Sequence, residues 1–156
     1  MEFFDLNWQQ FFVNLVKMLI AFALTLPVAW NRERESRSVG MRTFPIVSVA
    51  SCGFILLAIA ALGLEAEAQA RIIQGLMTGI GFVGGGAILK DGGSVHGTAT
   101  AASIWATGVI GASTAYGRYE IAILVSILNF ALLRFLPPVT GKIEEAVDEE
   151  ERDLLE

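Results

Sequence analysis

The chain has 156 residues, of which 54% are hydrophobic and 17% charged, and its mean hydropathy is +0.58. Typical soluble domains are about 25% charged and about 45–50% apolar, so this composition is that of a membrane protein. A net charge of −5 and a single cysteine exclude the basic face of a nucleic-acid binder and a disulfide scaffold.

Five segments have the length and apolarity of membrane-spanning helices, which need about 20 mostly apolar residues to cross about 30 Å of hydrocarbon. They are residues 11–30, 44–64, 72–89, 98–116 and 119–136. The last one stops at Pro137 and Pro138, since proline cannot continue a helix. The sequence therefore predicts an all-α, polytopic membrane helix bundle with five transmembrane helices.

The charges of the chain predict its orientation and its division. Basic residues collect in the first loop, at Arg32, Arg34, Arg37 and Arg42, and none precedes the first span. Because basic loops favour the cytoplasmic side, we expect the N-terminus outside and, after five crossings, the C-terminus in the cytoplasm. Eight of the 16 acidic residues lie in residues 142–156, which we interpret as an acidic cytoplasmic tail after a transmembrane domain of residues 1–141.

Small side chains predict where the helices touch. Within residues 98–115, 14 of 18 are Gly, Ala, Ser or Thr, which allows close backbone approach and favours a central position for this helix. The spacing of glycines on the third span also favours close helix crossing or a homodimer. The residues that we expect at helix contacts are Gly75, Gly79, Gly81, Trp105 and Gly108.

Three consecutive glycines, Gly84, Gly85 and Gly86, lie late in the third span, and each weakens a helix by about 1 kcal/mol relative to alanine. The favoured interpretation is close packing against the fourth span. The alternative is a broken helix that forms part of a solute site. The Asp-Gly-Gly sequence that follows favours a chain reversal.

Polar side chains inside the spans have two interpretations each. Lys17 either extends to the outer membrane surface or faces the bundle interior in a functional role. Gln74 and Asn129 either join helices by hydrogen bonds or line a solute path. We see no paired carboxylates, metal-binding cluster or nucleophile with its base, so we expect no enzymatic activity, cofactor or metal site.

Two stretches resemble the MgtC/SapB family, and the resemblance extends over about residues 15–135. Residues 32–35 (RERE) and 39–43 (VGMRT) are similar to the basic first loop of that family. The longer match comprises residues 71–90 (RIIQGLMTGIGFVGGGAILK), 92–98 (GGSVHGT) and 101–107 (AASIWAT). The motif residues in loops are Arg32, Glu33, Arg42, Arg71 and Lys90.

The resemblance implies a bacterial inner-membrane protein with five spans and a cytoplasmic C-terminus. It also implies a link to growth in low magnesium, survival inside macrophages, inhibition of the F-type ATP synthase, or acid resistance. Two positions depart from the family, because many members have Glu where Asn31 stands and His where Phe44 stands. Longer members also carry a folded cytoplasmic domain, which we do not expect in the short segment after Leu136.

Two functions are compatible with these features. The small-residue helices, the lack of an energy-coupling motif and the resemblance favour a regulator of a transport ATPase or the ATP synthase that acts by helix packing. The alternative is a small-solute or ion transporter or channel with its site near the glycine-rich third span. The expected partners are the lipid bilayer and such a membrane protein, with a homodimer as a further candidate and no nucleic acid.

Overall fold

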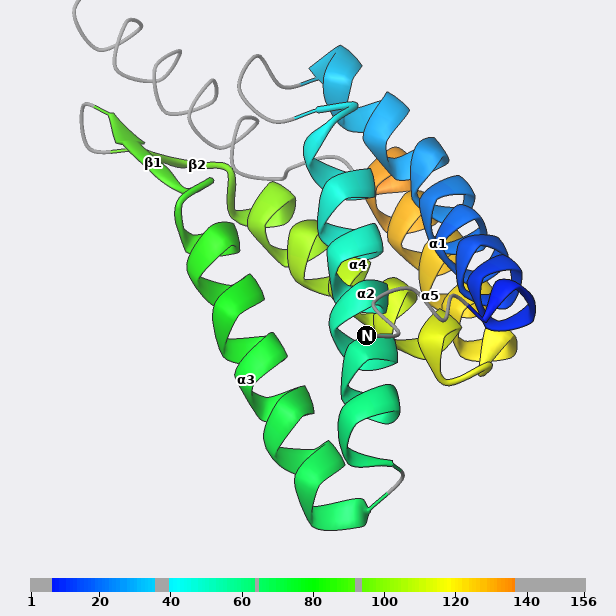
Figure 1. The fold of residues 1–156 in the computed structure, drawn as a ribbon. Coiled ribbons are helices and arrows are strands. Elements are labelled where there is room, and N and C mark those ends of the chain that lie inside the picture. Colours follow the sequence, from blue (N-terminus) through cyan, green and yellow to red (C-terminus); the bar gives the residue numbers. More distant parts are fainter. Residues whose placement is uncertain (1–6, 36–39, 64, 92–93, 137–156) are drawn as a thin grey trace, which may run out of the picture.

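The structure is a computed structural model that describes residues 7–35, 40–63, 65–91 and 94–136. These residues form five helices and one short hairpin (Figure 1). In chain order the elements are α1 (Trp8–Glu35), α2 (Thr43–Leu62), α3 (Ala66–Gly85), β1 (Leu89–Asp91), β2 (Ser94–His96), α4 (Thr98–Ala115) and α5 (Tyr119–Phe135). Arg37 and the acidic tail, residues 142–156, lie outside the described residues.

The expectation of a helical body with five helices is confirmed, and the largest difference is at the end of the third. The predicted span of residues 72–89 is wrong at both ends, because α3 runs from Ala66 to Gly85. Beyond Gly85 the chain turns, and β1 pairs antiparallel with β2, with Leu89 opposite His96 and Lys90 opposite Val95. The expected reversal is therefore part of a β-hairpin, which projects from the bundle beside α3 (Figure 1).

Two of the described helices, α1 and α2, are long and apolar enough to cross a membrane by length and composition. The other three described helices are shorter or contain more small and polar residues, which lowers their apolarity. The number of crossings and the orientation of the chain stay predictions.

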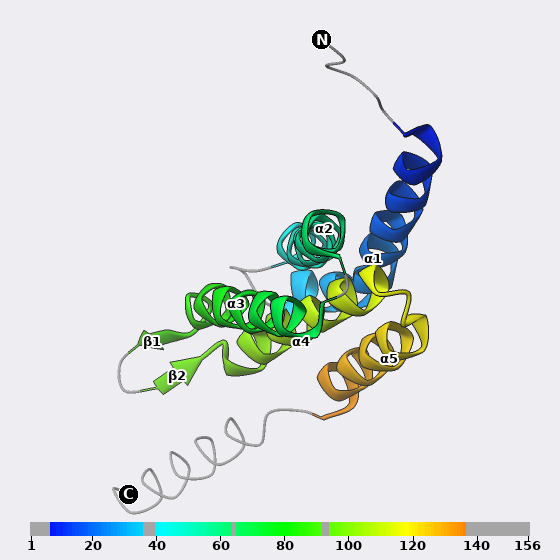
Figure 2. The same cartoon turned by 60° about the horizontal axis from the view of Figure 1, so that its bottom comes forward.

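Helix α4 is the centre of the bundle, as its composition predicts. It contacts each of the other four helices, and it lies between α3 and α5 in the view of Figure 2. Its fully buried side chains include Ile104 and Ile110, and also the hydroxyl-bearing Thr107 and Thr114. Both threonine hydroxyls donate to the carbonyl oxygen four residues earlier at 2.8 Å, so these polar groups are satisfied within the helix.

Helices α4 and α2 approach each other closely at Gly111. A Cβ atom at this position would lie 2.1 Å from the carbonyl oxygen of Ser48 and 3.0 Å from the Cβ of Ser51. A second close contact joins α4 to α3, where a Cβ on Gly108 would lie 2.1 Å from the Cδ1 of Ile80. Only glycine allows α2 to pack this closely, since the atom in the way is backbone.

Serine hydroxyls join the outer helices to α1. Ser48 Oγ on α2 donates to the carbonyl oxygen of Ala21 at 3.1 Å. Ser126 Oγ on α5 donates to the carbonyl oxygen of Leu24 at 2.5 Å. Both bonds require the helix backbones to lie within reach of a one-carbon side chain, which is a feature of tightly packed helices with small residues at their contacts.

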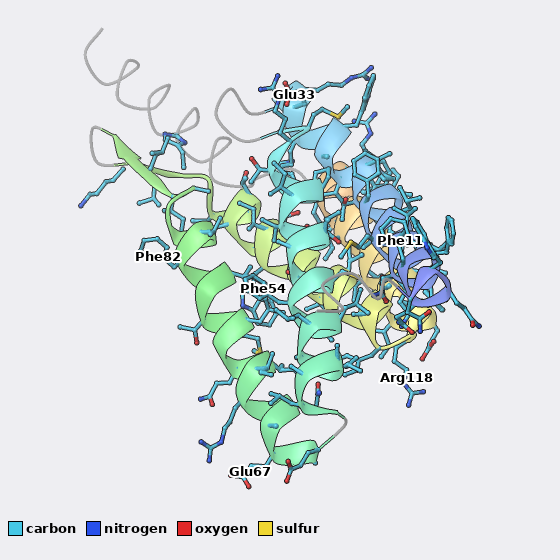
Figure 3. All side chains as sticks on the ribbon, viewed as in Figure 1. Phe11, Glu33, Phe54, Glu67, Phe82 and Arg118 are labelled. Carbon is cyan, nitrogen blue, oxygen red and sulfur yellow. The ribbon has the colours of Figure 1, made fainter. Side chains whose placement is uncertain are left out.

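Large apolar side chains cover the outside of the bundle. Phe82 on α3 is 86% exposed and points away from the other helices (Figure 3), and Phe54, Leu124 and Leu128 are also exposed. Monomeric soluble proteins rarely expose contiguous apolar patches of more than a few hundred Å². The surface therefore indicates a helical membrane protein.

The close contact at Gly111 predicts a loss of stability in Gly111→Ala. We expect a loss of about 1–3 kcal/mol, because α2 has to move to admit the added methyl group. The matched control is Gly75→Ala, which meets no atom within 4 Å and lies in a helix, so it should be neutral or gain up to about 1 kcal/mol. Unfolding in detergent followed by circular dichroism measures both; equal stability of Gly111→Ala and the wild type would contradict the packing described.

Candidate functional site

The polar residues predicted from the sequence do not meet at one place. Lys17, Gln74 and Asn129 belong to α1, α3 and α5. Lys17 and Asn129 bond to opposite ends of α4, at Ala115 and Ser103, and the side chain of Gln74 is exposed on α3. The structure therefore does not assemble a single intramembrane polar site from these three residues.

Lys17 faces the bundle rather than the surface. Its Nζ donates to the carbonyl oxygen of Ala115 at 2.7 Å. Ala115 is the last residue of α4, and the final carbonyls of a helix lack intrahelical partners and carry partial negative charge. The ammonium group thus caps the central helix and joins α1 to it.

A group of buried polar side chains lies between the helices around Ser103. Asn129 Nδ2 donates to the carbonyl oxygen of Ser103 at 3.4 Å, and Thr107 Oγ1 donates to the same oxygen at 2.8 Å. Within the part of the chain that the structure describes, the hydroxyl of Ser103 has no hydrogen-bond partner, and neither does Asn31 Nδ2, although Asn31 is only 8% exposed. The sequence alone does not single out Ser103, because a serine within a small-residue helix looks like any other packing residue.

The three glycines at residues 84–86 end α3 rather than interrupt it. A Cβ on Gly84 would lie 3.1 Å from the carbonyl oxygen of Ala101, so this residue allows α3 to approach α4. Gly85 is the last helical residue and a Cβ there would meet nothing within 4 Å. The amide of Gly86 donates to the carbonyl of Phe82 at 3.1 Å, which closes the helix end.

The motif residues expected in loops lie at both ends of the bundle, but the loop placement is wrong for most of them. Arg32 and Glu33 belong to the end of α1, and Arg42 is the N-cap of α2. Arg71 lies in α3 and Lys90 in β1.

At the end where α2 begins, Glu33 Oε2 accepts the amide proton of Met41 at 2.7 Å and holds the loop next to Arg42. A Cβ on Gly40 would lie 1.6 Å from that oxygen, so a larger residue here would displace the Glu33 side chain. At the opposite end, Arg71 forms an exposed ion pair with Glu67 at 2.7 Å; Glu33 and Glu67 are labelled in Figure 3.

Two apolar grooves flank α3. The α2–α3 groove has a volume of about 470 Å³ and opens where α3 diverges from α2 (Figure 1). Phe54 projects into it from α2, as Figure 3 shows, and Gly75 and Gly79 contribute its α3 side. Added Cβ atoms on these two glycines would meet nothing within 4 Å, so the described residues do not make the contacts expected at Gly75 and Gly79. The same holds for Gly81, which does not line the groove.

The α3–α5 groove lies on the other side of α3 and has a volume of about 440 Å³. Trp105, Gly108, Val109 and Ala112 of α4 form its floor. Side chains of α3 and Ile121 of α5 form its walls. Two of the residues predicted at helix contacts therefore lie here: Gly108 is against Ile80 of α3, whereas Trp105 is 43% exposed in the groove.

Helix α3 is held at both ends and open along its middle. Near its start, Gln69 Nε2 donates to the carbonyl oxygen of Gly63 at 2.6 Å, and Gln69 Oε1 accepts the hydroxyl proton of Tyr116. Beyond its other end, Gly97 has φ +87° and leaves no room for a Cβ, which would lie 2.1 Å from the carbonyl oxygen of Ala87. The two grooves run between these fixed ends.

Comparison with known proteins assigns the family. The MgtC family matches residues 18–142. Protein SrpB of Synechococcus elongatus is 34% identical over 120 residues, covering 69% of this chain and 66% of SrpB. Protein MgtC of Salmonella paratyphi A is 27% identical over 147 residues, covering 92% of this chain and 62% of that protein.

A third relative is named "Putative magnesium transporter YhiD", from Escherichia coli, and is 26% identical over 138 residues, covering 83% of this chain and 63% of YhiD. The chain spans about half to two thirds of the length of the curated relatives that it matches. No solved structure matches it. The match over residues 18–142 includes all of α2 to α5 and most of α1, and the chain belongs to the MgtC family.

Proposed function

We propose that this chain is a multi-pass protein of the bacterial cytoplasmic (inner) membrane that regulates a transport ATPase or the ATP synthase by binding one of its helices. The resemblance to the MgtC/SapB family supports a role of this regulator in adaptation to low magnesium or acid. The observation that carries the proposal is the α2–α3 groove, in which two glycines one helical turn apart meet no partner among the described residues.

The aromatic residues of α1 support the membrane placement. Trp8 lies in an exposed aromatic cluster with Phe11 and Phe12, and Trp30 stacks under the guanidinium of Arg34 at 5.0 Å. The 23 residues from Trp8 to Trp30 span about 33 Å of helix. This matches the hydrocarbon thickness of about 30 Å, and amphipathic aromatic side chains collect at both membrane interfaces.

The proposed orientation predicts the effect of reversing the basic loop. Replacing Arg32, Arg34 and Arg42 by Glu should move the loop to the outside in part of the molecules, because the basic residues near the first span set the orientation. The readout is labelling of Lys90→Cys, in a Cys52→Ala background, by a membrane-impermeant maleimide added to intact cells. The control is Arg71→Glu with Arg118→Glu at the opposite end, which should leave Lys90→Cys protected; unchanged protection in the loop variant would contradict the orientation.

The α2–α3 groove suits a helix better than a solute. Its lining is almost entirely apolar, and helices in membranes associate through small residues that let their backbones approach. Gly75 and Gly79 follow this small-xxx-small spacing on the open side of α3. A partner helix in the groove would pack against the part of α3 that α2 does not contact.

Filling the groove should abolish partner binding. In the variant Gly75→Leu with Gly79→Leu, we expect recovery of a co-purifying ATPase or ATP-synthase subunit in mild detergent to fall about tenfold, which corresponds to about 1.4 kcal/mol of lost packing. The matched control is Gly81→Leu with Gly85→Leu, which changes the same residue types outside the groove. Equal recovery with both variants, or a particle that contains only this chain, would contradict the proposal.

Transport of a small solute or ion is the second candidate, favoured by the name of YhiD and by the buried atoms Asn31 Nδ2 and Ser103 Oγ. In the part of the chain that the structure describes, no group of three or more His, Cys, Asp or Glu residues could hold a metal ion.

Flux distinguishes the two functions. For a regulator, liposomes that contain the protein should take up magnesium no faster than protein-free liposomes. Uptake above that level that falls in Asn129→Leu, but not in the lipid-facing control Leu128→Ala, would establish transport instead. Uptake that persists in both Gln74→Leu and Asn129→Leu would remove these residues from the path.

A further inference from the structure

The α3–α5 groove differs from the α2–α3 groove in having a cationic end. Arg118 lines it where α4 ends, together with Ser113 and Tyr116, while the rest of the lining is apolar. Arg118 is exposed, and in the described residues no ion pair engages it. The only described ion pair of this end of the bundle, between Arg71 and Glu67, lies on α3 outside the groove.

The backbone fixes the position of Arg118. After α4 the chain forms a Schellman motif, in which Gly117 adopts φ +73° and its amide donates to the carbonyl of Thr114 at 3.1 Å. The amide of Arg118 donates to the carbonyl of Ser113 at 2.8 Å. Arg118 is also the N-cap residue of α5, which begins at Tyr119, and among the described residues no side chain caps the first amides of that helix. The guanidinium and the positive end of α5 therefore lie at the same mouth of the groove.

We propose that the α3–α5 groove binds an anionic phospholipid, with its phosphate at Arg118 and one acyl chain along the α4 floor toward Trp105. The 12 residues from Trp105 to Tyr116 extend over about 16 Å of helix. This is the depth of one leaflet, about half of a 30 Å hydrocarbon core. The inference rests on the membrane placement proposed above and is independent of the partner that the regulator binds.

The chemistry of the groove favours a lipid over a helix. A helix with its side chains is about 10–12 Å across, whereas this groove is already bounded by three helices of the chain, with the small residues Gly108 and Ala112 on its floor. An acyl chain is thinner and needs no hydrogen-bond partners. A single cation at the depth of the headgroups matches a phosphate, which arginine binds through paired N–H groups.

Quenching of Trp105 by brominated lipids tests the site. Trp8→Phe with Trp30→Phe leaves Trp105 as the only tryptophan. This variant is reconstituted in phosphatidylcholine vesicles that contain one brominated lipid. The brominated lipid is either phosphatidylglycerol or phosphatidylcholine. We expect phosphatidylglycerol to occupy the position next to Trp105 with about fivefold preference, the size of effect of one basic side chain near anionic lipid.

Variants at two arginines identify the source of the preference. Arg118→Gln should reduce the preference to about one, while Arg118→Lys should retain most of it. The matched control is Arg71→Gln, which removes a cation from the same end of the bundle but outside the groove. A preference that persists in Arg118→Gln, or that is equally lost in Arg71→Gln, would overturn the assignment.

The remaining outcomes separate this inference from the proposed function. Equal quenching by both brominated lipids in the variant that retains Arg118 means that the protein is in the bilayer but has no anionic lipid site, which overturns the inference alone. Absence of quenching by either lipid means that Trp105 does not face acyl chains, which overturns the membrane placement as well.

Discussion

The contact between Gly111 and the carbonyl oxygen of Ser48 is the constraint on which the rest of the bundle depends. It allows α2 and α4 to approach with backbone against backbone. On another side of α2, where it packs against α1, a short hydroxyl side chain likewise reaches a backbone carbonyl, as Ser48 reaches Ala21. In a lipid environment such bonds matter, because no water is available to satisfy a buried hydroxyl group. The small residues of α4 thus determine both its packing and where polar groups can be buried.

A central helix of small residues has a second effect, on the helices around it. Since α4 fills little volume, α1, α2 and α5 close around it and turn their large apolar side chains outward. Helix α3 is different, because its main contacts are with α4 and its hydrogen bonds are near its ends. Its middle therefore has open space on both sides, and this is where the structure offers binding surfaces.

Helix positions and the central place of α4 could be predicted from the sequence, since both follow from local composition. The end of α3 could not, because residues 86–89 are apolar enough to continue the span, whereas the chain turns at residues 86–87 and enters β1 at Leu89. The position of Lys17 depends on where the last turn of α4 lies, 98 residues further along the chain. Gly75 and Gly79 have the spacing of a helix contact, but the sequence does not state whether the contact lies within the chain.

The same long-range dependence explains the polar residues near Ser103. Asn129 is a visible candidate because amides are rare in apolar spans, and its partner is a backbone carbonyl 26 residues away. The unsatisfied hydroxyl of Ser103 has no signature in the sequence, since 14 of the 18 residues around it are equally small. From the sequence, Arg118 likewise looks like an ordinary loop cation. Its position at a groove follows from the turn at Gly117 and the end of α4.

The wall between the two grooves is a single layer of side chains. Leu76 and Ile80 line both the α2–α3 groove and the α3–α5 groove, and Ile80 also occupies the space above Gly108. A rotamer change that moves either side chain out of one groove moves it into the other. The first groove widens and the second narrows, because the same atoms line both. A molecule bound in one groove is therefore mechanically coupled to the shape of the other groove, through the side chains of α3 that separate them.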